Sequence, residues 1–207
     1  MWLFTYRYDR PWPSSLDLRA PILATGVAGA VLLVLLAVPR ARKIAAGAWV
    51  ALAFDEWWAE AGFAVVSIDG RGAPGVAPSF EKVVHRRLAD VALTDQADAL
   101  RVLVGKHPDL DLSRVAVRGS GLGGWLALLA VLRRPDPFRR AVAREPVLDW
   151  DELPAPYAER YLGRAADSPD IYAHHSLREE TLPASVLVLA ADAPVRDELD
   201  FLLAGTH

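Results

Sequence analysis

The sequence predicts an α/β fold in which a mostly parallel sheet is flanked by helices. Short apolar runs that suit buried strands alternate with segments whose apolar residues recur every three or four positions. A glycine-rich turn joins one of these runs directly to a helical segment. Such alternation is typical of a parallel sheet covered by helices. The 207 residues are enough for one domain with a sizeable core.

The start of the chain has two interpretations. Residues 1–30 are predicted to form an N-terminal arm or strand, and residues 31–207 the domain itself. The stretch 20–39 carries no charge and is followed by basic residues, a pattern typical of a membrane span with a cytoplasmic flank. Glycines interrupt this stretch, however, and we favour a core strand of a parallel sheet at 31–38.

Beyond residue 45 the predicted elements alternate in type. Helical periodicity ended by glycine or proline marks the helices, and short apolar runs mark the strands. The predicted helices end at 62 or span 95–106, 125–134 and 196–204. The predicted strands span 63–69, 115–117, 141–143 and 185–190. Turn residues after the first of these strands predict a long loop that reaches about residue 93.

Composition argues against several classes of function. With a net charge of −3 and dispersed basic residues, the chain shows no electrostatic footprint for nucleic acid. The absence of cysteine excludes disulfides, thiol catalysis and cysteine metal sites. His174 and His175 are adjacent and would point apart, so we expect them to be solvated and not to bind metal. His85 and His107 are expected at the surface. No metal or cofactor is predicted.

The segment 115–125, VAVRGSGLGGW, is the most informative part of the chain. Its predicted strand, glycine turn and helix have the layout of a nucleophile elbow, G-x-S-x-G, which raises a reactive serine above the sheet in α/β-hydrolases. Gly119, Gly121 and Gly123 keep the spacing, but Gly121 stands in the serine's place and offers no nucleophilic atom. Ser120 leaves the turn from a different point and is not expected to substitute.

The same letters also spell G-x-G-x-x-G, the fingerprint of a dinucleotide site. That fingerprint normally opens the first βαβ unit and is followed by an acidic residue about twenty positions on. Here it lies in mid-chain and is followed at that distance by Arg139 and Arg140, which disfavours the dinucleotide interpretation.

An α/β-hydrolase places an acid and then a histidine after the nucleophile, each on a loop that follows a strand. Asp192 directly follows the predicted strand 185–190 and could orient a histidine, although it could equally be a plain loop aspartate. His207 is the only later histidine and is the last residue, where a frayed end is more common than a positioned base.

Four longer strings resemble the peptidase domain of the prolyl oligopeptidase family, closest to its dipeptidyl-peptidase IV branch. They are SIDGRGAPG (67–75), HRRLADVALTDQ (85–96), SRVAVRGSGLGGW (113–125) and EPVLDWDELPAPYAERYLG (145–163). The resemblance runs from about residue 32 to 204 and implies an α/β-hydrolase fold. Here that fold is expected to lack the family's propeller and its last strand.

The resemblance also implies roles for individual residues. Val147, Trp150, Tyr157 and Tyr161 match the family's pocket for the proline ring of a substrate. Without the resemblance, core packing would be the favoured interpretation of these residues. Asp192 matches the acid of the catalytic triad.

The chain departs from the family pattern in three places. Gly121 replaces the nucleophile, and only fifteen residues separate Asp192 from His207, where the family has some thirty between acid and histidine. Leu36 stands near the place of a tyrosine that donates to the oxyanion. The backbone N–H of Leu122 is then the one remaining oxyanion candidate.

We therefore expect a serine-type peptidase domain, specific by descent for cleavage after proline-like residues, that is inactive because of Gly121. The alternative is a non-catalytic module that uses the same fold for binding or assembly. The implied partners are a peptide or peptide-like ligand and a second copy in a homodimer. The expected location is the cytoplasm, or a membrane if residues 20–39 span one.

Overall fold

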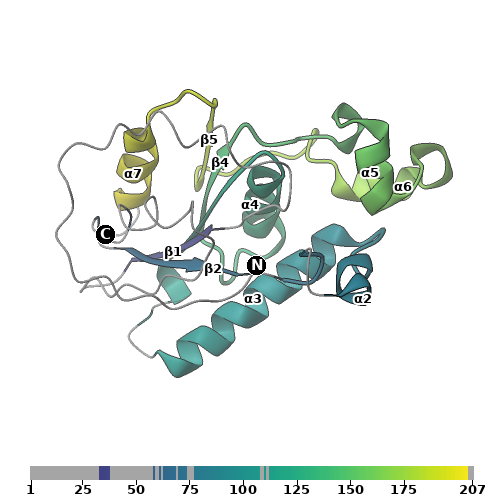
Figure 1. The fold of residues 1–207 in the computed structure, drawn as a ribbon. Helices are drawn as coiled ribbons and strands as arrows, with labels where there is room; N and C mark the ends of the chain where they lie inside the picture. The colour runs from purple at the N-terminus through teal and green to yellow at the C-terminus, as the bar shows by residue number, and fades with distance from the viewer. Residues whose placement is uncertain are drawn as a thin grey trace, which may run out of the picture.

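The computed structural model describes residues 33–37, 58, 61, 63–68, 70–73, 77–107, 110 and 112–204. Five strands form one sheet in the order β2-β1-β3-β4-β5 (Figure 1). They are β1 (Leu33–Ala37), β2 (Phe63–Ser67), β3 (Val115–Ser120), β4 (Arg140–Arg144) and β5 (Val186–Leu189). The pairs β3–β4 and β4–β5 are parallel, and β1 is antiparallel to both β2 and β3. Four of these five strands therefore run in one direction, and the mostly parallel sheet is confirmed.

Strand β1 confirms the strand predicted at 31–38 but corrects its direction. It was expected in parallel alignment, yet Leu33 pairs with Arg118 and Leu36 with Val115, an antiparallel register. An apolar run carries no information on strand direction, because both faces of a central strand are buried in either orientation. The remaining residues of 20–39, and the predicted arm at 1–30, lie outside the described residues.

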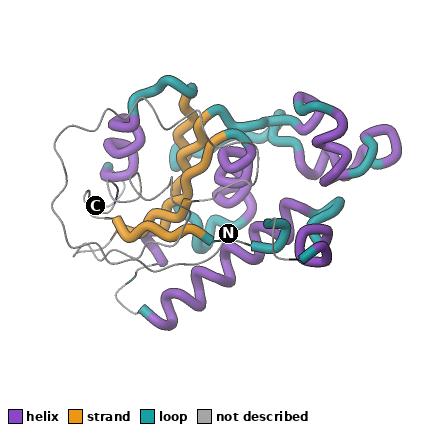
Figure 2. The backbone as a smooth tube through the Cα atoms, in the orientation of Figure 1, coloured by secondary structure: helices purple, strands orange, loops and turns teal. Residues whose placement is uncertain are grey.

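Helices cover both faces of the sheet, as the ribbon and the tube show (Figures 1 and 2). On one face lie α3 (Leu88–Lys106) and α4 (Leu122–Arg133), and on the other lies α7 (Val195–Leu203). The strands alternate accordingly. In β4, Ala141 and Ala143 pack on the α3 and α4 side, whereas Val142 packs with Leu202 of α7. This period of two makes the sheet the middle layer of three.

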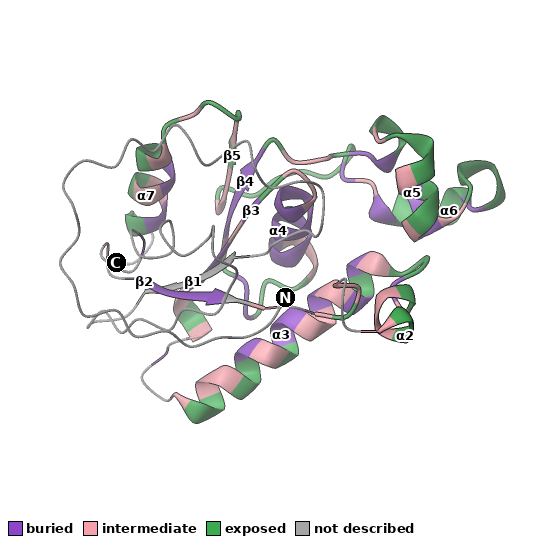
Figure 3. Cartoon of the chain, viewed as in Figure 1, coloured by how far each residue is buried: buried purple, intermediate pink, exposed green. Residues whose placement is uncertain are grey.

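The helices predicted at 95–106, 125–134 and 196–204 are confirmed in type, but the first two begin earlier, at Leu88 and Leu122, and the helix predicted to end at residue 62 lies mostly outside the described residues. The loop expected up to residue 93 contains α2 (Pro78–Lys82) and the first turns of α3. Helix α3 begins at Leu88 because the apolar residues Ala89, Leu93 and Ala97 recur every four positions on one helix face. All three are buried. Helix α4 is buried over nearly its whole length (Figure 3).

A long excursion between β4 and β5 carries α5 (Ala155–Leu162) and α6 (Pro169–His175). It packs against α4, on the face of the sheet that α3 and α4 cover. The indole Nε1 of Trp125 in α4 donates to the carbonyl of His175 at 2.8 Å. Arg133, at the end of α4, donates to the carbonyl of His174. The excursion is therefore fixed to α4 at both of these points.

The described helices bear on the possible membrane span. Among the described residues, none of the helices combines the length and the apolar character that a bilayer crossing requires. The five described residues of the uncharged stretch 20–39 belong to strand β1.

Candidate active site

The turn between β3 and α4 is as sharp as the glycine spacing predicts. Gly121 has φ 56° and ψ −118°, a conformation that residues with a Cβ atom rarely adopt and only with strain. Leu122 begins helix α4 immediately after it. The strand, bend and helix of a nucleophile elbow are therefore all present.

Gly119 and Gly124 allow the backbone segments around this turn to approach closely. A Cβ atom at Gly119 would lie 2.1 Å from the carbonyl oxygen of Gly123, a distance that no side chain can occupy. A Cβ atom at Gly124 would lie 3.1 Å from the Cα atom of Pro146. The glycines bring the helix onto the strand, and the segment after β4 onto the helix.

Gly121 is held by three backbone hydrogen bonds. Its N–H donates to the carbonyl of Arg144 at 3.0 Å, and its carbonyl accepts from Trp125 at 3.0 Å and from Val147 at 3.3 Å. A Cβ atom placed on Gly121 would meet nothing within 4 Å. The apex of the elbow therefore opens into free space, and no oxygen stands on it.

A hydrogen bond and ring contacts link the residues predicted to form a proline pocket to one another and to the segment around the apex. Val147 is tied to Gly121 by the hydrogen bond just described. The ring of Trp150 lies 5.2 Å from that of Trp125 and 6.1 Å from that of Tyr161. Because Trp150 is fully buried, it can serve only as a floor beneath Tyr161 and not as an exposed wall.

Tyr157 and Tyr161 share one face of α5, as their spacing of four predicts. Their ring centroids are 5.3 Å apart, and both side chains are partly buried against the core. Burial, reinforced by the neighbouring Tyr161, raises the pKa of Tyr157 to about 12. The Tyr157 phenol is therefore neutral over the physiological range and keeps a proton to donate.

The other three predicted catalytic positions are Asp192, Leu122 and His207. Asp192 is exposed on the turn after β5, at the same sheet edge as the elbow, because β3, β4 and β5 are parallel. Leu122 occupies the first helical position of α4, where a backbone N–H has no acceptor within its helix. His207 lies outside the described residues.

Leu36 is not beside the elbow, contrary to the expectation. It pairs with Val115 at the start of β3, whereas Gly121 follows the last residue of that strand. Gly121 is six positions beyond Val115, which corresponds to about 20 Å along the strand. The antiparallel direction of β1 is the reason. Leu36 therefore says nothing about an oxyanion site in this arrangement.

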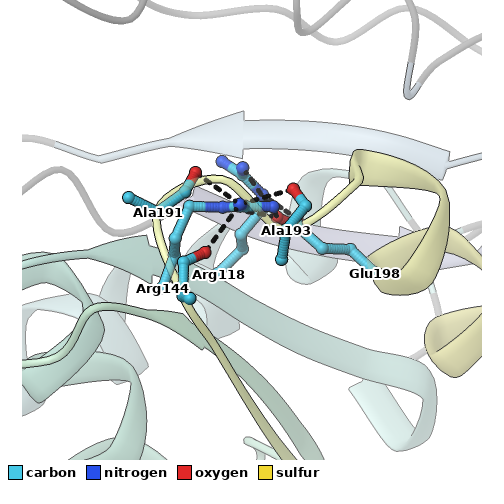
Figure 4. A network of polar contacts seen from close by, with 6 residues as sticks. Arg118, Arg144, Ala191, Ala193 and Glu198 are labelled. Atoms are coloured by element: carbon cyan, nitrogen blue, oxygen red, sulfur yellow. Dashed lines mark hydrogen bonds and ion pairs between the residues drawn. The ribbon is translucent and has the colours of Figure 1, made fainter.

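Three charged residues that the sequence analysis did not single out meet near the Asp192 turn (Figure 4). Glu198 of α7 has no exposed surface and is paired with Arg118 of β3 and Arg144 of β4. The Nε atom of Arg144 donates to Glu198 at 3.0 Å, and Arg118 Nη2 does so at 3.2 Å. The signal available in the sequence was the presence of arginines within strands whose neighbours are apolar.

Arg144 also reaches the turn that carries Asp192. Its Nη1 atom donates to the carbonyl oxygens of Ala190, Ala191 and Ala193 at 3.0, 2.9 and 2.7 Å (Figure 4). Its own carbonyl accepts from Gly121. One residue therefore contacts both the apex of the elbow and the turn of the candidate acid.

His175 corrects the expectation that both adjacent histidines are solvated. It is fully buried and stacked on Trp125, with ring centroids 5.8 Å apart. Its Nδ1 lies 2.8 Å from the carbonyl of Ile171, and its Nε2 accepts from the N–H of Ala89. Desolvation lowers the pKa of His175 to about 4, so the ring is neutral. His174 is exposed, as expected, beside Asp90.

The turn at 70–73 has a structural anchor. Arg71 donates from its backbone N–H to Asp95 Oδ2 at 2.7 Å and from its side chain to Oδ1 at 2.6 Å. Burial raises the pKa of Asp95, but the hydrogen bonds from Arg71 outweigh it and hold this pKa below its usual range. A Cβ atom at Gly72, where φ is 98°, would strike Val84 at 2.8 Å.

Two hollows lie at the other edge of the sheet, away from the elbow. One of about 380 Å³ is bounded by the end of α4 and the segment before β5, and one of about 110 Å³ lies at the amino ends of β3 and β4. In the part of the chain that the structure describes, no three metal-ligating side chains gather in one place. The elbow and the turn of Asp192 both follow the carboxyl ends of parallel strands, at the opposite edge of the sheet.

Comparison with known proteins agrees with this geometry. Residues 53–193 match the model of the prolyl oligopeptidase family. Human dipeptidyl peptidase 8 is 36% identical over 105 residues, 51% of this chain and 12% of the relative. Mouse inactive dipeptidyl peptidase 10 is 29% identical over 125 residues, 57% of this chain and 16% of the relative. The chain thus spans less than a fifth of either protein.

One solved structure resembles the chain over most of its length. It is a protein of Bacteroides ovatus described as a dipeptidyl aminopeptidase IV, with a TM-score of 0.60 and 26% identity. The match covers 80% of this chain and 25% of the other. The fold is therefore that of the α/β-hydrolases.

Proposed function

Because the chain belongs to the prolyl oligopeptidase family, we propose that it is a serine-peptidase domain that holds a peptide but does not perform the nucleophilic step. The observation that carries the proposal is Gly121, which keeps the backbone of the elbow and has no side-chain oxygen. Loss of the nucleophile from a Ser-His-Asp site leaves only about 10³ to 10⁴ of acceleration over water, from binding and the oxyanion hole.

The proposed ligand is a peptide with a proline-like residue. Tyr157 and Tyr161 offer partly buried aromatic faces on α5, Trp150 lies beneath them, and Val147 is bonded to the apex. The pyrrolidine ring of proline is apolar and compact, and its CH₂ groups can pack against such aromatic faces. The mouse relative named as inactive supports the idea that this family includes members without catalysis.

The missing nucleophile is tested with a fluorophosphonate probe, which labels activated serines. We expect no labelling of the wild-type chain, and the same result for Ser120→Ala. Because a Cβ atom at position 121 meets no other atom, Gly121→Ser gives a matched variant with a hydroxyl at the apex. Stoichiometric labelling of the wild type that disappears in Ser120→Ala would overturn the proposal.

Ligand binding needs its own measurement, since a silent apex is also what an assembly module would show. Titration with a prolyl dipeptide is followed by tryptophan fluorescence, with the glycyl analogue as control. We expect saturable binding of the prolyl peptide alone, weakened at least tenfold by Tyr157→Ala. Equal response to both peptides, or none to either, would favour the module that serves assembly.

A further inference from the structure

Three charged side chains are largely buried inside the fold, where apolar residues are usual: Arg118, Arg144 and Glu198. Each arginine directly follows three apolar residues, all Val or Ala, in its strand, and Glu198 lies on the inward face of α7 with no exposed surface. Burying a charge is costly unless it is paired and hydrogen-bonded. An apolar trio would fill the same space without that cost. The charges therefore call for a role that apolar residues could not perform.

The role is visible in what Arg144 contacts beyond Glu198. Arg144 donates to Glu198 through Nε and Nη2, which leaves its Nη1 atom for other acceptors. That atom lies 2.7 to 3.0 Å from three carbonyl oxygens of the turn 190–193. Hydrogen bonds from a charged donor are stronger than those between neutral groups. The turn is thus fastened at three points around Asp192.

We propose that Arg144 is the positioning residue of Asp192, fixing its turn relative to the elbow apex. The backbone of Arg144 accepts from Gly121, and its side chain holds the turn, so the two sites are joined through one residue. Glu198 holds the guanidinium in place from the opposite side. The relevance of this geometry to a ligand rests on the function proposed above.

Arg118 provides a matched control. It shares Glu198 with Arg144, and among the described residues it reaches none of the three turn carbonyls. Arg118→Met and Arg144→Met each remove one of the two arginine partners of Glu198. Only Arg144→Met also removes the hydrogen bonds to the turn.

Hydrogen exchange followed by mass spectrometry tests the proposal on the whole chain. In Arg144→Met we expect the amides of 191–193 to exchange at least tenfold faster than in the wild type. Exchange in the buried helix α4 measures global unfolding, and the rates of the turn amides are corrected for it. After this correction, the turn amides of Arg118→Met should exchange at the wild-type rate. Arg144→Lys keeps the charge but has fewer donors, so its turn amides should exchange at a rate between those of the wild type and Arg144→Met. This variant replaces Arg144→Met if Arg144→Met does not fold.

Equal acceleration in the two methionine variants, or none in either, would overturn the proposal. The prolyl dipeptide titration separates this result from the function proposed above. If the wild type binds no dipeptide while the exchange results hold, only the proposed function fails. If binding is normal and both methionine variants exchange alike, only the positioning role fails. Weaker binding in Arg144→Met than in Arg118→Met would support both.

Discussion

Alanine substitutions at Gly119, Gly121 and Gly105 give a graded test of the elbow. A Cβ atom at Gly119 would lie 2.1 Å from a backbone oxygen of Gly123 and 2.7 Å from the backbone nitrogen of Gly124. Ordinary contact begins at 3.4 Å, so the strand and helix would have to separate by about 1 Å. Because only backbone atoms are involved, we expect a cost above the ~1–3 kcal/mol of ordinary overpacking.

Gly121→Ala probes backbone conformation alone. The new methyl group meets nothing within 4 Å, so its cost comes from φ 56° and ψ −118°. Residues held in such sparsely populated regions cost about 1–3 kcal/mol. Gly105 lies in α3 with open space around it, and alanine there should stabilise the protein by about 0.5–1 kcal/mol.

The measurement is urea unfolding followed by tryptophan fluorescence at one pH. The expected order of stability is Gly105→Ala, wild type, Gly121→Ala and then Gly119→Ala. Ser120→Ala, at the exposed end of β3, should stay within about 0.5 kcal/mol of the wild type. If Gly119→Ala unfolds no more easily than Gly121→Ala, then β3 and α4 do not approach as closely as the elbow requires.

Two further predictions concern pH. Because the pKa of His175 falls from 6.5 to about 4 on folding, the unfolded chain takes up a proton first, and about 3 kcal/mol should be lost between pH 7 and pH 4. Urea unfolding across this range should show a smaller loss in His175→Gln than in His174→Gln. Since the pKa of Asp95 is lowered, Asp95→Asn should destabilise the protein at pH 7, and the difference should vanish as Asp95 protonates in acid. A constant difference at all pH values would contradict this.

The elbow could be predicted because its geometry depends on residues close together in the chain. Only glycine permits the contact between Gly119 and Gly123, and the backbone angles of Gly121 strain any other residue, so the spacing of the glycines indicates the turn. The strands were predictable for a similar reason, since short apolar runs bounded by turns have few other uses. Helix boundaries were less certain, because Asp95 resembles the start of a helix and instead binds Arg71 in mid-helix.

The buried polar contacts could not be predicted, because they join residues far apart in sequence. Arg118 and Glu198 are eighty positions apart, and nothing local indicates which carboxylate an arginine in a strand will meet. His175 differs from His174 only by the rotation of about 100° between successive helix positions, which places one ring in the core and the other outside. The direction of β1 was hidden for the same reason, as pairing is a property of the sheet.

The shape of the elbow does not depend on the group at its apex, and this explains how it can persist without a nucleophile. Gly121 is held by bonds to Arg144, Trp125 and Val147, all made by its backbone. A serine at this position would bear the strain of the turn, which glycine adopts freely. Replacing serine by glycine therefore removes the chemistry and relieves strain without removing any of these bonds. A retained elbow is thus evidence of descent, whereas nucleophilic catalysis at this position would require an oxygen at the apex.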